Sequence, residues 1–220
     1  MATRPIFVPS ESPKLLVREI QGNFKWNPGF SPSQKKKNIT ALHAVAKKQG
    51  IWPVLEVSTK STDELGLQLS AFHLRVALEN RRWISLESAF QGSKVFQAGG
   101  PYTDLYEKTG FEIKKDVRLR TSGHLLGFSF QGVFWDLEPK TAFYDWLYLH
   151  SVHSDRELRK GIVKYNGFTD IEFNPRRSIN CQARSCALYV VLVRRGVLED
   201  VLNDRSAFLQ LLNNSSFYTL

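Results

Sequence analysis

A carboxylate, an amide and an amine recur at helical spacing in the segment WISLESAFQGSKVF, residues 83–96. At about 100° per residue, Glu87, Gln91 and Lys94 fall within roughly 60° of one another on one helix face. Glu87 and Lys94 are then about 10 Å apart along the axis, too far for an i,i+4 ion pair. We therefore expect room for a ligand between them, in an arrangement that suits acid–base and covalent catalysis. The alternative is an amphipathic helix whose polar face is only solvated.

The helix that carries this stripe is predicted from about Leu86 to Ala98. Ser85 is the expected N-cap, which places the charge of Glu87 in the first turn, where it is favourable. The glycines at 99 and 100 should end the helix. Apolar residues on the other face are expected to point into a core.

Other segments give a coarse map of the chain. Residues 1–40 are rich in Pro, Ser, Gly and Lys and are interpreted as loop, with a helix from Thr40 to a stop at Gly50. Strands are expected at 52–59 and 125–137, and a hairpin at 71–86 that turns near Glu79-Asn80. Helices are expected over 141–166, broken at Ser154-Asp155, and over 181–212, with a helix end at 194–196.

These segments predict an α+β fold that is mainly helical and has a small β-sheet. A length of 220 residues with 42% hydrophobic residues supports one domain with a real core, so we expect a single domain over 1–220. Residues 1–40 would be a loop-rich N-terminal extension packed on it.

The formal net charge of +9 favours polyanionic partners, because Lys and Arg neutralise phosphates and release counterions. Cys181 and Cys186 do not have the spacing of a zinc or redox motif, so we expect buried free thiols and a reducing compartment. We find no signal-peptide pattern and no apolar run near the length that crosses a bilayer. A cytoplasmic protein without a membrane partner is the expectation.

Several longer motifs resemble one protein family. LSAFHL followed by WISLESAFQGSKVF is similar to the core of the NADAR superfamily, also called YbiA-like. The resemblance is closer to the branch found beside DarT-type toxins, through STKSTDELGLQLSAF, ESAFQGSKVFQAGGPYTDL, TAFYDWLY and FTDIEFNPRRSINCQARSCAL. Ala71 and Ser88 depart from the superfamily's usual Asn and aromatic or His, which we interpret as the mark of a sub-branch.

The resemblance implies an ADP-ribosylglycohydrolase that removes ADP-ribose from guanine bases in DNA. Such an enzyme would be the antitoxin of a DarT-type DNA ADP-ribosyltransferase. ADP-ribosylated DNA, the product ADP-ribose and the cognate toxin are the implied partners, and no cofactor or metal is required. Two alternatives stay open: a non-catalytic module that binds ADP-ribose or nucleic acid, and an N-glycosidase acting on riboflavin-pathway intermediates.

In this interpretation Lys94 is the nucleophile, through a Schiff base, and Glu87 is the acid–base. Lys25 and Lys35 remain alternative nucleophiles. Side chains or backbone expected to bind the substrate are Ser70, Ser85, Gln91, Gly100, Asp170, Asn180 and Arg184.

A second group of residues is expected to contact nucleic acid or phosphate: Lys35, Lys36, Lys37, Trp26, Arg176 and Arg177. The three lysines are interpreted as a basic loop, for which solvation alone is the competing explanation, and Asn38 is an alternative organiser of that loop. Trp26 is the tryptophan expected to stack on a base. His150 and His153 have i,i+3 spacing but no evident third metal ligand.

Overall fold

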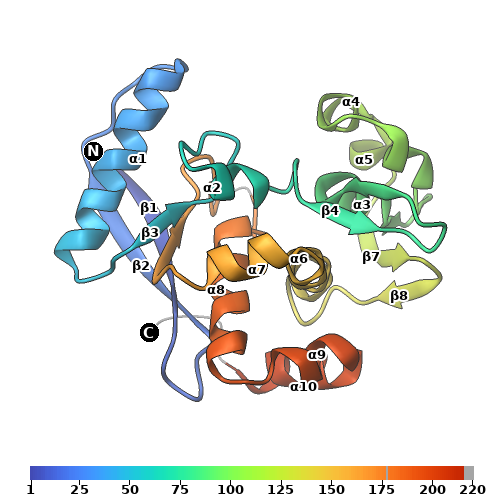
Figure 1. Cartoon of the computed structure of the whole chain (residues 1–220). Coiled ribbons are helices and arrows are strands. Elements are labelled where there is room, and N and C mark those ends of the chain that lie inside the picture. Colours follow the sequence, from blue (N-terminus) through green and yellow to red (C-terminus); the bar gives the residue numbers. More distant parts are fainter. Residues whose placement is uncertain (177, 216–220) are drawn as a thin grey trace. The chain divides into compact units, whose positions relative to one another are not determined.

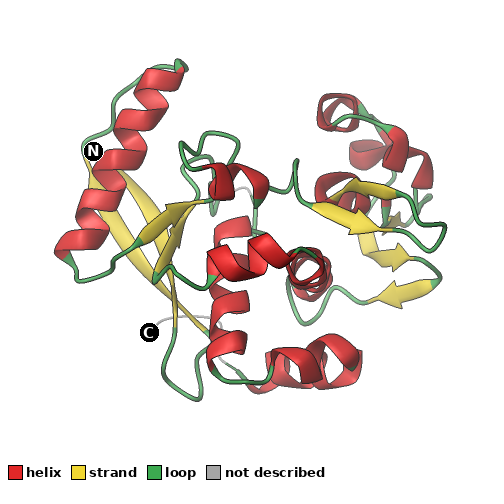
Figure 2. Ribbon diagram, viewed as in Figure 1, coloured by secondary structure: helices red, strands yellow, loops and turns green. Residues whose placement is uncertain are grey.

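The computed structural model describes residues 1–176 and 178–215. Of the described residues, 43% are helical and 20% are in strands, which confirms the α+β fold with more helix than strand. The chain forms two compact units, Met1–Ser70 with Asp155–Leu220 (unit 1) and Ala71–Ser154 (unit 2). Figure 2 shows that each unit contains both helices and strands. The expectation of one domain over 1–220 stays a prediction.

Unit 1 is built on a four-stranded sheet in the order β2-β1-β9-β3. The long strands β1 (Ala2–Pro9) and β2 (Val17–Phe24) are antiparallel, with Ala2 opposite Phe24. Strands β3 (Val54–Glu56) and β9 (Gly167–Thr169) are short and parallel, so that their carboxyl ends lie side by side. Helix α1 packs on the sheet through Ile39 and Leu42, and α8 also packs against it (Figure 1).

The prediction of a loop-rich segment over residues 1–40 was wrong. Two eight-residue strands occupy much of it. Pro5 and Pro9 lack the N–H of a ladder residue and reduce the strand signal of this run. The strand forms because Ile6 and Phe7, both buried, also pair with β9, more than 160 residues further along the chain.

Helix α1 (Pro32–Lys48) begins eight residues earlier than Thr40, so that start was also wrong. The Ser31 side chain accepts a hydrogen bond from the Gln34 N–H, and proline occupies the first helical position, where its missing N–H costs nothing. Lys35, Lys36 and Lys37 therefore lie on a helix and not in a basic loop. The expected stop is confirmed, because the helix ends at Lys48 and Gly50 has a φ of 77°.

Unit 1 has five further described helices, of which α8, with 13 residues, is the longest. They are α2 (Glu64–Gln68), α7 (Arg156–Ile162), α8 (Gln182–Arg194), α9 (Leu198–Asn203) and α10 (Arg205–Asn214). The Asp155 carboxylate accepts hydrogen bonds from the N–H groups of Glu157 and Leu158, which confirms the predicted break and N-cap. Gly196, with a φ of 68°, follows α8 and confirms the helix end predicted at 194–196.

Unit 2 contains two small antiparallel sheets. The predicted hairpin is confirmed as β4 (Arg75–Ala77) and β5 (Trp83–Ser85). The other sheet has the order β6-β7-β8, from β6 (Lys94–Phe96), β7 (Leu125–Phe130) and β8 (Val133–Trp135). Its helices are α3 (Leu86–Gly92), η1 (Thr103–Glu107), α4 (Gly110–Lys115), α5 (Arg118–Thr121) and α6 (Ala142–Ser154).

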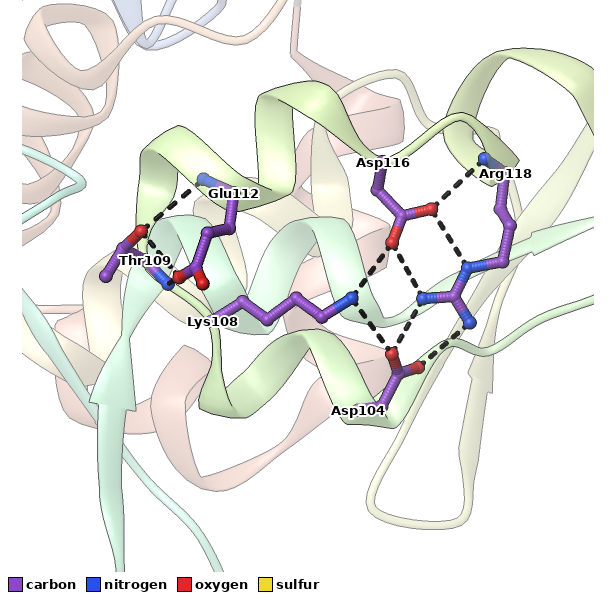
Figure 3. A network of polar contacts seen from close by, with 6 residues as sticks. All are labelled: Asp104, Lys108, Thr109, Glu112, Asp116 and Arg118. Carbon is purple, nitrogen blue, oxygen red and sulfur yellow. Dashed lines mark hydrogen bonds and ion pairs between the residues drawn. The ribbon is translucent and has the colours of Figure 1, made fainter.

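The segment between β6 and β7 is held by a network of ion pairs (Figure 3). Arg118 donates to both carboxylate oxygens of Asp104 and of Asp116, and Lys108 contacts the same two carboxylates. The Asp116 side chain is largely covered, whereas Asp104 is about half exposed. Hydrogen bonds from Arg118 and then Lys108 hold the pKa of Asp116 well below its usual range.

We expect Asp116→Asn to destabilise the protein by on the order of 1 kcal/mol, because it removes the shared acceptor of a partly exposed network. Since the pKa of Asp116 is depressed in the folded state, its contribution is present above the unfolded pKa and is lost as the pH falls. Urea unfolding at pH 7 and pH 4 measures both effects. Asp136→Asn, at an exposed aspartate outside the network, is the matched control. Equal midpoints for the two variants at pH 7 would contradict the expectation.

Candidate active site

Glu87 and Lys94 lie on two consecutive elements of unit 2. Ser85 caps α3 by accepting a hydrogen bond from the Ser88 N–H at 3.0 Å, as predicted, and Glu87 occupies the first turn. The apolar side of the helix, Leu86, Ala89 and Phe90, is buried. The helix therefore presents Glu87 on its half-exposed side and fixes the backbone position from which the carboxylate extends.

The helix is shorter than predicted, and Lys94 is not part of it. Helix α3 ends at Gly92, and Lys94 is the first residue of β6, paired with Phe128 of β7. The buried Ser93 hydroxyl donates to the Ala89 carbonyl at 2.6 Å and sits at the change of direction. The prediction that Glu87 and Lys94 are about 10 Å apart along one helix axis was thus wrong. The helix stops before Lys94 because residues 94–96 pair with β7, a distant segment of the chain.

The Lys94 amine is in a poorly solvated place. Its Nζ atom lies 5.2 Å from the centroid of the Phe90 ring. Burial lowers the pKa of Lys94, while the negative charge of Glu87 raises it by a smaller amount. Among the described residues neither Lys94 nor Glu87 has an ion-pair partner within 4.0 Å. The amine and the carboxylate therefore influence each other without being closed into a salt bridge.

Gln91 lies one turn after Glu87 and holds its carboxylate. The Gln91 Nε2 atom donates to the Glu87 Oε1 atom at 3.1 Å, and the Glu87 N–H donates to the Ala71 carbonyl at 2.9 Å. Ser85, predicted to bind substrate, is engaged in capping α3 and contacts the Ser88 hydroxyl at 2.7 Å. Both residues are placed to position Glu87.

Gly100 supports the Lys94 backbone. A Cβ atom at this position would lie 2.2 Å from the Lys94 carbonyl oxygen, and the φ of 94° is also unfavourable for other residues. Gly100 is therefore required for the close approach of two backbone segments. Gly100 therefore helps to place Lys94, whether or not the Gly100 backbone also contacts a phosphate group.

Four other predicted substrate residues belong to unit 1. Ser70 is fully buried at the end of that unit's first segment, and Arg184 is half-buried in the first turn of α8. Asp170 is buried directly after β9, where its carboxylate accepts hydrogen bonds from the Glu172 and Phe173 N–H groups and from the Gln182 side chain. Burial raises the pKa of Asp170 to about 6, although these donors oppose the shift.

The Asn180 side chain has one buried polar atom, Oδ1, without a hydrogen-bond partner among the described residues. A buried acceptor without a donor costs about 1–3 kcal/mol. The substrate-binding role of Asn180 stays a prediction.

The residues predicted to contact nucleic acid have different surroundings. The Lys35 ammonium group pairs with Glu172 at 2.6 Å and lies over the Trp26 ring, which also contacts Arg4. Lys36, Lys37 and Arg176 are exposed, and Arg177 lies outside the described residues. Asn38 is fully buried and exchanges hydrogen bonds with the Asn27 backbone, so it orders the preceding loop.

Sequence reasoning missed Glu56, a buried carboxyl group at the carboxyl end of β3. It accepts hydrogen bonds from the Ser58 hydroxyl, the Thr169 hydroxyl and the Ile171 N–H at 2.6–2.8 Å. Burial, followed by the charge of Asp170, raises the pKa of Glu56 to about 8. The signal available in the sequence was an acidic residue inside the apolar run WPVLEVST, since a lone carboxylate there needs donors.

His43 continues this network on the α1 side. Its Nε2 atom lies 2.9 Å from the Thr169 hydroxyl, and burial lowers the pKa of His43 to about 4, so the ring is neutral near pH 7. Both cysteines are buried free thiols, as predicted. In the part of the chain that the structure describes, no group of three or more His, Cys, Asp or Glu side chains is placed to hold a metal ion.

Residues 2–219 match a protein family described as DarT1-associated NADAR antitoxin. The chain belongs to this family. The match spans both units and confirms the resemblance drawn from the sequence motifs. A search of curated proteins found no match.

Membership of the DarT1-associated NADAR antitoxin family assigns an antitoxin role in association with a DarT1 toxin. No helix among the described residues has the length and apolar composition needed to cross a membrane. The NADAR chain thus places the predicted acid–base and amine in unit 2, and Asn180 and the buried Asp170 and Glu56 in unit 1.

Stability of this NADAR protein should depend on pH through Glu56. In the folded state the pKa of about 8 lies above the unfolded value of about 4.3, so the folded protein holds the proton more tightly. The stabilisation that protonated Glu56 gives to the folded state is complete below about pH 4.3 and is lost as the pH rises through about 8.

We therefore expect the melting temperature to fall between pH 5 and pH 9 by several degrees more in the wild type than in Glu56→Gln, which has no charge to develop. Thermal unfolding at the two pH values measures the difference. Glu11→Gln, at an exposed position, controls for a general charge effect. A parallel fall in the wild type and Glu56→Gln would show that Glu56 does not carry this dependence.

Proposed function

We propose that this NADAR antitoxin removes ADP-ribose from guanine bases in DNA and so reverses the modification made by a DarT-type ADP-ribosyltransferase. The observation that carries the proposal is the desolvated Lys94 amine beside the Glu87 carboxylate, without a salt bridge between them. Family membership supports the antitoxin role. The net charge of +9 supports a nucleic-acid substrate.

The reaction cleaves the bond between ribose C1 and the exocyclic nitrogen of guanine. In the first step, Glu87 in its acid form donates a proton to the ribose ring oxygen, the ring C–O bond breaks, and C1 is left as an iminium carbon. The neutral Lys94 amine then adds to C1 and forms a C–N bond. Burial of Lys94 favours the neutral amine that this step requires.

Release of guanine requires a proton transfer. The Glu87 carboxylate takes a proton from the Lys94 nitrogen and delivers it to the guanine nitrogen, so that the C1–guanine bond breaks and guanine regains its amino group. The Schiff base between C1 and Lys94 is then hydrolysed by water, which restores the lysine amine. The sum is addition of one water molecule to one N-glycosidic bond.

Other residues bind and orient in this mechanism. Gln91 holds the Glu87 carboxylate through its hydrogen bond of 3.1 Å. The unpartnered Asn180 oxygen is suited to a ribose hydroxyl. Arg184 and the exposed Arg176 are candidates for the pyrophosphate or the DNA backbone, since guanidinium groups bind phosphates through paired donors.

We expect Lys94→Met and Glu87→Gln each to slow release of ADP-ribose by about 10²–10⁴-fold, because each removes one chemical group from the reaction. The assay follows ADP-ribose released from an oligonucleotide with one ADP-ribosylated guanine. Borohydride reduction during turnover, followed by peptide mapping, should locate the adduct on Lys94. Lys25→Ala and Lys35→Ala test the alternative nucleophiles, and thermal unfolding checks that all variants fold.

Two outcomes would overturn this assignment. A reduced adduct on a peptide that lacks Lys94 would move the nucleophile elsewhere. Tight binding of the modified oligonucleotide without release by the wild type would make the protein a binding module and not an enzyme.

The pH dependence of adduct formation gives a separate prediction. Since burial lowers the pKa of Lys94, the rate should rise with pH to a plateau whose midpoint lies below that of an ordinary lysine. Removal of the Glu87 charge in Glu87→Gln should lower this midpoint further, because that charge favours the protonated amine. The measurement is the rate of borohydride-trapped adduct formation with free ADP-ribose from pH 6 to pH 10. A midpoint that rises in Glu87→Gln would contradict the expected sign.

A further inference from the structure

Unit 2 contains a pocket that the catalytic groups do not occupy. It lies between the β4–β5 hairpin, the β7–β8 turn and α6, with a volume of about 260 Å³. This is below the range of about 300–1,000 Å³ that holds a drug-sized ligand. The size suits a single flat ring system and excludes a peptide helix or strand.

The lining of the pocket is aromatic and polar. Trp83 and Arg75 stand on the same face of the hairpin, while Val76 and Ile84 on the other face are buried. Trp83 remains 55% exposed, which is unusual for the largest apolar side chain. An exposed indole beside a guanidinium group provides a stacking surface and hydrogen-bond donors at one place.

The opposite wall comes from α6 and the β7–β8 turn. The His150 ring packs against the Trp146 ring, with 4.3 Å between centroids, and both line the pocket. The Gln131 Oε1 atom accepts a hydrogen bond from the Glu79 N–H, which leaves the amide N–H groups as the part of Gln131 available to a ligand. This wall therefore combines the ring surfaces of Trp146 and His150 with the hydrogen-bonding amide of Gln131.

One residue that lines the pocket, Phe130, lies on the strand that pairs with Lys94. Phe130 lies two positions after Phe128 on β7, and Phe128 is the partner of Lys94 in β6. With strands about 4.8 Å apart and a rise of about 3.4 Å per residue, the Lys94 and Phe130 Cα atoms are about 8 Å apart. One modified nucleotide is long enough to place its reacting C1 at Lys94 and a base in the pocket.

We propose that this pocket binds a nucleobase of the substrate, stacked on Trp83 and hydrogen-bonded by Arg75 and Gln131. The inference rests on the proposed function, because it takes the substrate to be ADP-ribosylated DNA. The base has two possible sources with the same chemistry: the adenine of the ADP-ribose group, or a DNA base next to the modified guanine. Aromatic stacking is tolerant of base identity, so the pocket requires a ring and not a particular sequence.

The first test compares steady-state constants for the single-stranded modified oligonucleotide. Trp83→Ala should raise KM by about 5–150-fold, the range expected from loss of one stacked base, with kcat little changed. Trp83→Phe keeps an aromatic face and should retain most of the affinity. The matched control is Trp52→Ala, since Trp52 is 52% exposed but lies in unit 1 and does not line the pocket. KM values that agree between Trp83→Ala and Trp52→Ala would overturn the proposal.

A second test separates the two sources of the base. The same constants are measured on an oligonucleotide with abasic sites on both sides of the modified guanine. If the pocket holds a flanking DNA base, the effect of Trp83→Ala disappears on this substrate. If the pocket holds adenine, the effect is unchanged.

Binding titrations keep this inference distinct from the proposed function. Fluorescence anisotropy of labelled modified oligonucleotide gives a Kd for each variant without requiring turnover. A wild type that binds but does not release ADP-ribose, with binding weakened in Trp83→Ala but not in Trp52→Ala, would refute the hydrolase and support the pocket. Release by the wild type with equal Kd values for the two variants would support the hydrolase and refute the pocket. A wild type that neither binds nor releases refutes both.

Discussion

Unit 1 depends on one buried carboxyl group. Glu56 is 2% exposed and lies at the carboxyl end of β3, where no water can replace its hydrogen-bond partners. Its donors come from the Ser58 side chain, from Thr169 at the end of β9 and from the Ile171 backbone. They are in reach because β3 and β9 are parallel and in register, with Glu56 opposite Thr169. The three hydrogen bonds to this carboxyl group thus fix the carboxyl ends of β3 and β9 and the start of the segment that carries Asp170. The carboxyl ends of parallel strands are where ligands bind in many α/β proteins.

Unit 2 uses a different device to place its chemical groups. Glu87 lies in the first turn of a capped helix. Lys94 lies on a strand whose backbone is paired with β7 and is closely approached by the backbone of Gly100. Two rigid elements that meet at Ser93 therefore hold a carboxylate and an amine independently. On a single longer helix both side chains would have followed one axis, and their separation would have been set by helical rise alone. The turn at Gly92-Ser93 removes that constraint, and the Lys94 amine reaches the partly covered position above Phe90.

Features determined by neighbouring residues could be predicted from the sequence, and features determined by distant partners could not. The caps Ser85 and Asp155 and the hairpin turn near Glu79-Asn80 follow from local side-chain chemistry, and all three were confirmed. Strand β1 needs β9 as a partner, and Lys94 needs Phe128, so neither strand could be seen in the local pattern. For the site, residue types singled out Glu87 and Lys94, but the local pattern put both on one helix, whereas Lys94 lies on β6. Glu56 was missed because two of its donors, Thr169 and Ile171, lie more than 110 residues away.

The two glutamates also show why burial alone does not identify an acid–base residue. Burial raises the pKa of Glu56, yet all its hydrogen bonds come from the protein and any change of its charge disturbs the frame of unit 1. Glu87 is half-exposed, is held by the Gln91 amide on one oxygen, and lies near an amine with which it does not pair. A group that shuttles protons must be able to gain and lose charge without breaking the fold, and it must be reachable by the substrate. Glu87 meets both conditions and Glu56 meets neither, so the half-exposed carboxyl group is the better candidate for the chemistry.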